Sequence, residues 1–487
     1  MKNNLLIKTT LLLLVLLSAE SQAQSYQLFW SDEFNGTALD ENYWNYELGN
    51  GNWGWGTGQV DYDTKRDTNV HVRGGYLTIQ TLKESNYWNT DIYNNWKQYS
   101  HTSGRLNTAK KLSFKHGKVE MRAKVPKGVG EGVALWMLPT FDKFGGWPRS
   151  GEIDVLEICG AQTTQSQGTM HFGESGNDQH SYAIYKPTPT DLADDFHVYG
   201  IEWTATQLKW YIDGNVFKTA DISVPYGTQY YFPFNEEFYI ILSAGVGAAM
   251  CGKDDGAAMM AKYIVDYVRV YKTADEIVTI PAKIQAEAFT SEKGTQKEVC
   301  TDTDGGYDMG QIGTGDFLSY NLVAQDAGLY KATFRVAAGT GYSGAIKISS
   351  GGVQLGTANV STTGGWQSWQ DVLLQFTLKK GVQNITLDFT GQFNLNYVNY
   401  ELISTEVQPI AVELPKVFPN PFSSEIHIAS QEEDATVRVF DLSGRIVLYE
   451  SFKKGNSVLN TSQFSAGVYL VQIETESAVS TVKLVKE

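Results

Sequence analysis

Three carboxylate residues lie within six positions of one another, in a stretch of otherwise aliphatic residues. Residues 151–158 read GEIDVLEI, which places acids at Glu152, Asp154 and Glu157. Side chains two positions apart in a β-strand point to the same face, so Glu157 would point away from the other two in a regular strand. A β-bulge at Val155–Leu156, one extra residue in the strand, would turn Glu157 back beside them. We therefore predict a bulged strand that gathers three carboxylates on one face.

Such a group of carboxylates suits the hydrolysis of a glycosidic bond. Like charges on one face of a sheet repel one another, and a purely structural sheet gains nothing from that repulsion. Retaining glycosidases use two carboxyl groups roughly 5–5.5 Å apart, one ionised to attack the anomeric carbon and one protonated to assist the leaving oxygen. Mutual repulsion raises the pKa of the most crowded carboxyl and so separates the two roles. The structural alternatives are an exposed acidic strand and a cation site.

The elements that must position these residues are β-strands. Short segments of alternating apolar and polar residues, bounded by Gly, Asn and Asp, run through most of the chain, as in Tyr76–Gln80, Lys118–Val125 and Val265–Tyr271. A period of two is typical of a half-buried strand, and helical periodicity is scarce. The 47 glycines supply the turns. We therefore predict an all-β protein.

The motifs around the acids resemble glycoside hydrolase family 16, in its laminarinase-like branch, over roughly residues 26–272. The motifs that carry the resemblance are Gly151-Glu-Ile-Asp-Val-Leu-Glu157, Trp30-Ser-Asp-Glu-Phe34, Gly54-Trp55-Gly56, Thr102-Ser-Gly-Arg105, Trp136-Met-Leu-Pro139, Trp147-Pro148, Phe196-His-Val-Tyr-Gly-Ile-Glu-Trp203, Tyr211-Ile-Asp-Gly214 and Val265-Asp-Tyr-Val-Arg-Val-Tyr271. The resemblance implies a β-jelly roll whose concave sheet carries the substrate cleft. It makes Glu152 the nucleophile, Asp154 the assisting residue and Glu157 the acid/base.

The same resemblance implies further site residues. Those that would contact substrate are Asn69, Arg105, Trp136, Trp147 and His171. Those that would hold a structural calcium ion are Glu33, Gly75 and Asp266. Hard oxygen ligands drawn from both ends of the module suit Ca²⁺. No catalytic cofactor is expected.

Two places depart from the family's pattern. Gly132 and Val133 stand where many relatives have Trp-Pro, and the loop at residues 245–252 lacks the Trp that commonly follows its paired glycines. Missing aromatics near a cleft would widen it or change its subsites. The substrate within the family therefore stays open at this point.

Three cysteines are present, at Cys159, Cys251 and Cys300. An odd number rules out a complete disulfide framework. A Cys159–Cys251 bridge is one possibility, but we expect unpaired buried thiols.

Two polar, proline-containing segments divide the 487-residue chain, one after Tyr271 and one from Ser404 to Pro415. A chain of this length exceeds one ordinary domain. The modules that we predict are a concanavalin-like β-jelly roll catalytic domain over 25–272, a β-sandwich over 283–404 and a small β-sandwich over 416–487.

The middle module resembles a carbohydrate-binding module of family 6. The motifs that carry this resemblance are Ile284-Gln-Ala-Glu-Ala-Phe289, Gly315-Asp-Phe-Leu-Ser-Tyr320, Gly328-Leu-Tyr330, Thr363-Gly-Gly-Trp366-Gln-Ser-Trp369 and Phe393-Asn-Leu-Asn-Tyr397. The resemblance implies a second calcium ion, with the ligands Gln285, Glu287 and Asp388. It also implies a sugar site built from Trp366 or Trp369 together with Asn394. Gln311 stands where many relatives have an aromatic residue, which would make the site one-sided.

The two ends of the chain indicate export. Residues 1–23 carry Lys2 and Lys8, an apolar run from Leu11 to Leu17 and a small-x-small site at residues 21–23, as a signal peptide does. That run is too short to span a bilayer, and no other segment predicts a transmembrane helix. Residues 416–487 resemble the C-terminal sorting domain of type IX secretion substrates. We therefore expect the type IX machinery as a partner, and a secreted or surface-attached protein that has passed through the periplasm.

Charge narrows the choice of partner. The formal net charge is −15, so phosphate backbones and anionic lipids are repelled and a neutral polysaccharide fits better than nucleic acid. We expect a monomeric endo-acting enzyme that cleaves laminarin-like β-1,3-glucan with retention. The alternatives are mixed-linkage β-glucan or an agarose-type galactan as substrate, and a non-catalytic surface glycan binder.

Overall fold

The computed structural model describes nine stretches of the chain. They are residues 25–174, 179–223, 233–248, 250–253, 261–303, 305–405, 416–441, 445–475 and 479–487. The predicted signal peptide lies outside these residues. The chain forms two compact units, Met1–Thr405 and Glu406–Glu487. In the described part, no helix has the length and apolar character needed to cross a membrane.

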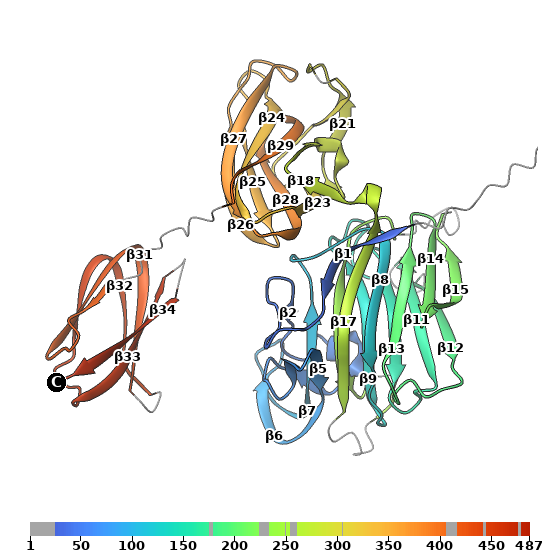
Figure 1. Ribbon diagram of the computed structural model, residues 1–487, viewed down its shortest axis with the longest axis horizontal. Helices are drawn as coiled ribbons and strands as arrows, with labels where there is room; N and C mark the ends of the chain where they lie inside the picture. Colours follow the sequence, from blue (N-terminus) through green and yellow to red (C-terminus); the bar gives the residue numbers. More distant parts are fainter. Residues whose placement is uncertain are drawn as a thin grey trace, which may run out of the picture. The chain divides into compact units, whose positions relative to one another are not determined.

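Two sheets form the N-terminal domain, which is the predicted catalytic domain, and all their strand pairs but one are antiparallel (Figure 1). The eight-stranded sheet follows the order β15 (Asn215–Asp221), β14 (Gln207–Ile212), β13 (His197–Trp203), β8 (Gly117–Lys124), β17 (Lys262–Thr273), β5 (Tyr76–Gln80) and β4 (Val70–Arg73), with β1 (Tyr26–Asp32) paired to β17. The sequence of β8 alternates, and its apolar residues Val119, Met121 and Ala123 are fully buried. The face of the sheet that carries these three residues therefore packs into the domain core.

The nine-stranded sheet carries the carboxylates. Its order is β12 (Gln179–Pro187), β11 (Gln165–Gly173), β10 (Glu152–Cys159), β9 (Glu131–Pro139), β16 (Phe238–Val246), β7 (Trp96–Asn107) and β2 (Asn45–Tyr46), and β3 (Asp61–Asp63) and β6 (Leu82–Thr90) also pair with β7. A short π-helical turn, η1 (Gly54–Gly58), precedes β3. Ile153, Leu156 and Ile158 point from β10 into the core, which leaves the opposite face for the acids.

The middle module consists of two six-stranded sheets over one buried cluster. The first sheet contains β18 (Val278–Ile280), β23 (Phe317–Ala324), β28 (Gly381–Gly391), β25 (Gly344–Ser350) and β26 (Val353–Val360), with β20 (Ser291–Lys293) paired to β23. The second contains β21 (Gln296–Val299), β22 (Tyr307–Gly310), β29 (Asn394–Ser404), β24 (Gly328–Ala337) and β27 (Trp369–Leu378), with β19 (Ala282–Gln285) paired to β29. Two 3₁₀ turns, η3 (Ala274–Glu276) and η4 (Ala286–Ala288), lie near its start.

The tail is a separate unit with its own core. Its five strands are β30 (Lys416–Phe418), β31 (Glu425–Asp441), β32 (Ile446–Asn460), β33 (Gly467–Thr475) and β34 (Val479–Lys486). Ile426, Val437 and Leu484 are buried in one cluster. The all-β prediction is confirmed for the described residues.

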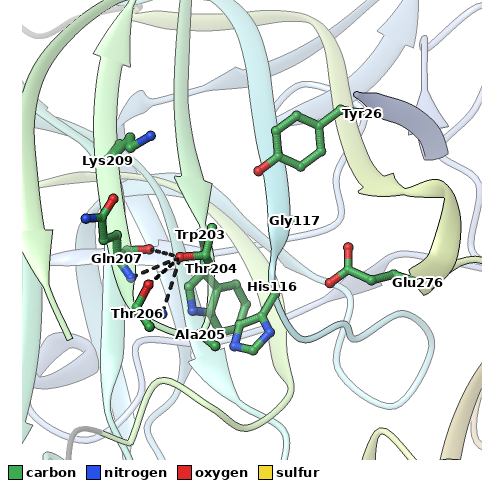
Figure 2. Close-up of a pocket in the computed structure, with 10 residues that line it drawn as sticks. All are labelled: Tyr26, His116, Gly117, Trp203, Thr204, Ala205, Thr206, Gln207, Lys209 and Glu276. Atoms are coloured by element: carbon green, nitrogen blue, oxygen red, sulfur yellow. Dashed lines mark hydrogen bonds between the residues drawn. The ribbon is translucent and has the colours of Figure 1, made fainter. Parts of the chain in front are cut away.

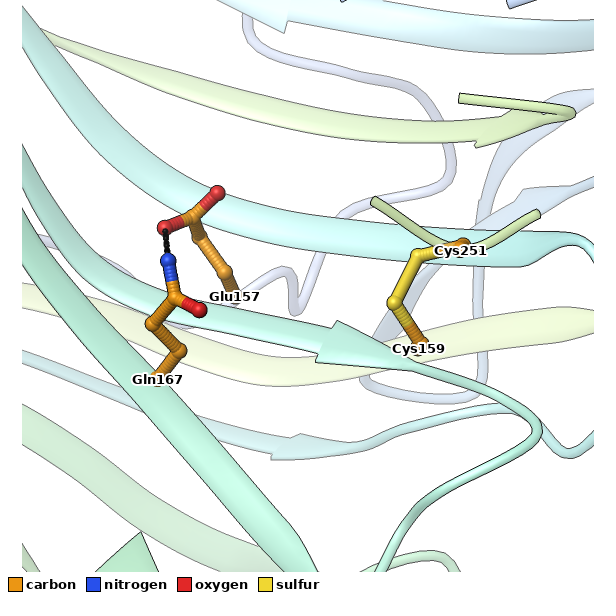
Figure 3. The surroundings of a disulfide bond; sticks show 4 residues. All are labelled: Glu157, Cys159, Gln167 and Cys251. Atoms are coloured by element: carbon orange, nitrogen blue, oxygen red, sulfur yellow. Dashed lines mark hydrogen bonds between the residues drawn. A yellow bond between two sulfur atoms is a disulfide. The ribbon is translucent and has the colours of Figure 1, made fainter. Parts of the chain in front are cut away.

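The expectation of three unpaired thiols is wrong for two of them. Cys159 and Cys251 form a disulfide, whereas Cys300 is free and buried as expected (Figure 3). Cys159 is the last residue of β10, and its neighbour on β9 is Gly132. On the other side of β9, Gly132 pairs with Gly245 of β16. A side chain at Gly132 would meet Cys251 Sγ at 3.0 Å. The glycine in place of a larger residue therefore leaves room for the bridge.

Candidate active site

The predicted bulge is present in β10. Asp154 pairs with Trp136 of β9, but the register then shifts so that Glu157 pairs with Ala134. The pairing with β11 shifts at the same point, between Asp154 and Glu157. Residues directly opposite one another in a sheet point to the same face. The bulge therefore brings all three acids to one face, which we call the carboxylate face.

Glu152 is the first residue of β10, and an aromatic side chain from the preceding loop contacts it. The indole N–H of Trp147 donates a hydrogen bond to Glu152 Oε2 at 2.5 Å. Trp147 is half exposed, and its ring lies 5.7 Å from that of His171 on β11. A donor on the carboxylate and an exposed indole beside it are features that a sugar-cleaving nucleophile can use.

Asp154 is the most deeply buried of the three acids. His171 Nε2 lies 3.3 Å from Asp154 Oδ2 and 4.0 Å from Glu152 Oε1. His171 pairs across the strands with Glu152, so it also lies on the carboxylate face, where it was predicted. The oxygens of the two acids and the imidazole nitrogen lie within 4.8 Å of one another, a spacing that a cation could also use.

Glu157 receives two hydrogen bonds on a single oxygen. Thr169 Oγ1 donates to Glu157 Oε2 at 2.8 Å, and Gln167 Nε2 donates to the same atom at 2.9 Å (Figure 3). Both donors come from β11. An oxygen that accepts two hydrogen bonds is the unprotonated one of a carboxylic acid. A proton on Glu157 therefore resides on its other oxygen, Oε1.

Burial raises the pKa of all three carboxyls. Burial and then the charge of Asp154 raise the pKa of Glu152 to about 8, while His171 and the Trp147 hydrogen bond act in the opposite direction. Burial, followed by the Glu157 charge, raises the pKa of Asp154 well above its usual value, and burial also raises the pKa of Glu157. The face therefore retains a proton near neutral pH.

A proton on Asp154 leaves the best nucleophile at Glu152. Asp154 is hydrogen-bonded to Glu152, and its protonation removes the second cause of the high Glu152 pKa. Glu152 would then keep the hydrogen bond from Trp147, which favours its ionised form. The arrangement can thus hold one charged carboxylate and one protonated carboxyl, Glu157, on the same face.

Arg105 lies in the row of residues that leads to Glu157. It pairs with Ser243 of β16, which pairs with Ala134 of β9, the partner of Glu157. Its guanidinium lies between two indoles, 4.6 Å from the ring centre of Trp55 and 4.7 Å from that of Trp136.

Glu47 forms an ion pair with Arg105 at 2.5 Å and so fixes the guanidinium. Sequence reasoning assigned roles to Arg105 and Trp136 but not to Trp55 or Glu47. The Gly54-Trp55-Gly56 motif was the available signal for Trp55. Glu47 carried no comparable signal.

Asn69 does not reach the carboxylate face. Its side chain is fully buried, and it accepts hydrogen bonds from Thr64 and Arg66 and donates to Gln80 and Thr102. All its hydrogen-bonding capacity is used inside the domain. The structure therefore gives Asn69 the role of a support for the loop before β4 rather than that of a substrate contact.

The predicted sugar site of the middle module is only partly assembled from the predicted residues. Asn394 Nδ2 donates to the carbonyl of Trp366, and the exposed ring of Trp366 lies 4.8 Å from that of Tyr342. Glu298 and Asp308 accept hydrogen bonds from the same Asn394 amide. Tyr342, Glu298 and Asp308 were not predicted, since they come from three other segments.

Trp369 begins β27, and its indole nitrogen is buried with no hydrogen-bond partner among the described residues. Of the two tryptophans in this motif, Trp366 is the exposed one. The exposed ring is the better surface for stacking on a sugar.

The two predicted calcium sites differ in how well their residues suit a cation. In the catalytic domain, both oxygens of Glu33 accept hydrogen bonds from Arg269, and Asp266 is paired with Arg122. These carboxylates are already balanced by arginines. In the module, Glu287 Oε2 is buried and has no hydrogen-bond partner among the residues that the structure describes, as the ligand of an ion would. The second site therefore fits Ca²⁺ better than the first.

A polar pocket of about 530 Å³ has none of the three acids in its lining (Figure 2). It is lined by Tyr26, His116, Gly117, Trp203, Thr204, Ala205, Thr206, Gln207, Lys209 and Glu276. Burial lowers the pKa of His116 to about 4, so its imidazole is neutral at neutral pH. The pocket contains one carboxylate, Glu276, and no pair of acids. It therefore lacks the groups for glycoside hydrolysis.

Comparison with known proteins supports the three-module organisation. The model of the family described as glycosyl hydrolases family 16 matches residues 50–269, and that of carbohydrate-binding module family 6 matches residues 285–401. The secretion system C-terminal sorting domain matches residues 416–487, which indicates export by type IX secretion.

Several known proteins share the catalytic domain. Glucan endo-1,3-beta-glucosidase A1 of Niallia circulans is 40% identical over 50% of this chain, which spans 38% of that protein. Glucan endo-1,3-beta-glucosidase of Cryptopygus antarcticus is 36% identical over 47% of this chain and 83% of its own length. The solved laminarinase catalytic domain from Thermotoga maritima is 37% identical, with 51% of this chain and 98% of that chain covered and a TM-score of 0.46. The Cryptopygus antarcticus protein, 36% identical and matched over 83% of its length, shows that the chain belongs to glycosyl hydrolase family 16.

Proposed function

We propose that this glycoside hydrolase is an endo-acting β-1,3-glucanase that works by double displacement. The observation that carries the proposal is the bulge of β10, which puts Glu152 and Glu157 on one face with Asp154 between them. The relatives named as glucan endo-1,3-beta-glucosidases support the substrate class.

In the first step, the ionised Glu152 attacks the anomeric carbon and forms a glycosyl-enzyme ester. Glu157 delivers the proton of its Oε1 to the leaving oxygen, while Thr169 and Gln167 hold its Oε2 in place. In the second step, Glu157 removes a proton from water, and the resulting hydroxide displaces Glu152. Two inversions at the same carbon give net retention.

Asp154 and His171 assist without bonding to the sugar carbon. Protonation of Asp154 removes a negative charge from beside Glu152, which favours the ionised nucleophile before attack. His171, close to both acids, orients and balances the pair. The half-exposed ring of Trp147 and the clamped Arg105 are placed to contact sugar rings and hydroxyls beside the reacting bond.

We also propose structural Ca²⁺ in this enzyme. Glu287, together with Gln285 and Asp388, would hold it in the module. In the catalytic domain the predicted ligands are Glu33, Gly75 and Asp266, and an ion there would have to displace the arginines that now pair with the two carboxylates. Calcium would cross-link chain segments and take no part in the reaction. Thermal unfolding after chelator treatment and after Ca²⁺ is restored tests this, because an unchanged midpoint would remove the proposal.

Release of reducing ends from laminarin, lichenan and agarose tests the substrate. We expect cleavage of laminarin with the highest kcat/KM, and products several sugars long, as an endo-acting enzyme gives. Glu152→Gln serves as the control, because it keeps the size and polarity of the side chain but cannot act as a nucleophile. Binding of a glucan by the wild-type protein without any cleavage would favour a glycan binder instead.

A further inference from the structure

The loop that connects β9 to β10, residues 140–151, leads directly into the catalytic strand. It carries Trp147, whose N–H contacts Glu152. Within the loop, Ser150 Oγ accepts a hydrogen bond from Phe144 N–H and donates to the carbonyl of Gly145. These bonds give the loop a fixed shape. Arg149 of the loop also pairs with Glu174 of the catalytic domain.

The outer side of this loop packs against the middle module. The ring of Phe141 lies 4.2 Å from that of Phe317, the first residue of β23. Phe317 is 7% exposed, so the contact removes it almost fully from water. Lys143 pairs with Glu236 of the catalytic domain at 2.8 Å and lies 3.8 Å from Glu292 of the module.

Glu237 joins the loop and the module at a second point. Its backbone carbonyl accepts a hydrogen bond from Thr140 N–H, at the base of the loop. Its carboxylate accepts hydrogen bonds from Asn321 of the module at 2.9 Å and from Ser113 of the catalytic domain at 3.2 Å. Asn384 of the module donates to Ser113 and to Asn321.

This polar network is buried. Glu237, Ser113, Asn321 and Asn384 are all at least nine-tenths buried. A buried carboxylate is stable only when its oxygens are hydrogen-bonded, so separation of the module from the domain would leave Glu237 without its Asn321 partner. Both the network and the Phe141–Phe317 contact lie within one compact unit of the chain. The module is therefore held against the loop, not merely tethered to it.

We propose that the middle module is a structural support of the active site, which positions Trp147 and thereby Glu152 through its contact with the 140–151 loop. This role is separate from sugar binding by the module. It predicts that the module affects cleavage of short soluble substrates that do not need a second binding site. The inference rests on the proposed function, since it concerns the same catalytic strand.

The residues that carry the support are positioning residues, because none of them touches the reacting atoms. Phe141→Ala, Phe317→Ala and the double variant remove the aromatic contact in the full chain. Leu373→Ala, an exposed residue of β27 in the same module, is the matched control. Phe141 is partly exposed on a loop, so its replacement keeps the fold even if Phe317→Ala does not.

Hydrogen exchange of the 140–151 peptide tests the contact independently of activity. We expect faster exchange in both single variants than in the wild-type and Leu373→Ala proteins. Unchanged exchange would overturn the proposal even if the enzyme cleaved no glucan. The support of the loop by the module and the proposed glucanase activity can therefore fail independently of each other.

Kinetics on a short β-1,3-gluco-oligosaccharide tests the consequence. We expect kcat to fall about 5-fold in each single variant and by about the same factor in the double variant, because the two rings form one contact. Equal kcat for Phe141→Ala and wild type would overturn the proposal.

A pH profile separates positioning from loss of stability. Loss of the Trp147 hydrogen bond disfavours the ionised form of Glu152, so the acidic limb of kcat/KM should move to higher pH in both variants and not in Leu373→Ala. The groups that face Glu152 and stay in place are Asp154, Glu157, His171 and Tyr239. A lower rate with an unshifted limb would show that the contact affects stability alone.

Discussion

Trp147 donates its indole N–H to Glu152 Oε2 at 2.5 Å. This bond links the loop before β10 to the residue that we propose as nucleophile. It also opposes the rise in the pKa of Glu152 that burial and Asp154 cause. The loop therefore tunes the acid as well as presenting an aromatic surface.

Trp147→Phe keeps the ring and removes the donor. Without the N–H the ionised form of Glu152 is less stable, so its pKa rises and the acidic limb of kcat/KM moves to higher pH. We expect kcat/KM at neutral pH to fall about 10-fold, the effect of one charge-assisted hydrogen bond. Trp88→Phe, at an exposed tryptophan of β6, is the control and should leave the profile unchanged.

Glu152→Gln should stabilise the protein while it abolishes activity. The pKa of Glu152 is raised from 4.5 to about 8, so the folded state binds this proton more tightly than the unfolded state does. The free energy of unfolding therefore falls as pH rises from about 4.5 to about 8, and the amide removes that loss.

The gain from Glu152→Gln should be about 4 kcal/mol at pH 8 and about 1 kcal/mol at pH 5. Thermal unfolding at the two pH values measures it. Glu41→Gln, at an exposed carboxylate, should change neither midpoint. An equal gain at pH 5 and pH 8 would show that the charge of Glu152 is not the cause.

Arg105→Lys tests the stacking of the Arg105 guanidinium between the rings of Trp55 and Trp136. Lysine keeps the charge near Glu47 but cannot stack as a planar group between two indoles. We expect KM for laminarin to rise about 5-fold with kcat nearly unchanged, because the contact is made in both ground and transition states. A fall in kcat at constant KM would place Arg105 in the chemistry instead.

Removal of the disulfide should lower stability. Cys159 and Cys251 are 92 residues apart, and a cross-link over such a loop stabilises a folded protein by about 3–4 kcal/mol. The double variant Cys159→Ser/Cys251→Ser should therefore unfold at a lower temperature and a lower denaturant concentration. Cys300→Ser leaves the bridge intact, and an equal loss in that variant would contradict the interpretation.

The carboxylate face was predictable because its signal is local. Glu152, Asp154 and Glu157 lie within six residues, and the period of a strand shows that a bulge is needed to unite them. The bulge is where the spacing required it, between Asp154 and Glu157. The all-β architecture followed from the same period of two.

The features that sequence reasoning missed depend on distant segments. Cys251 meets Cys159 across Gly132, where a side chain would crowd the Cys251 sulfur. Trp55 and Glu47 reach Arg105 from two separate loops. The buried bonds of Asn69 and the contact of Phe141 with Phe317 likewise join segments that no short motif relates.

Azide rescue tests the assignment of the two glutamates most directly. Glu152→Ala and Glu157→Ala would be assayed with an aryl β-1,3-gluco-oligosaccharide that has a good leaving group, with and without azide, and the products identified by NMR. We predict an α-glycosyl azide from Glu152→Ala, because azide then replaces the nucleophile in one inversion. We predict a β-glycosyl azide from Glu157→Ala, because azide then intercepts the glycosyl-enzyme. A β-azide from Glu152→Ala, or an α-azide from Glu157→Ala, would contradict the account.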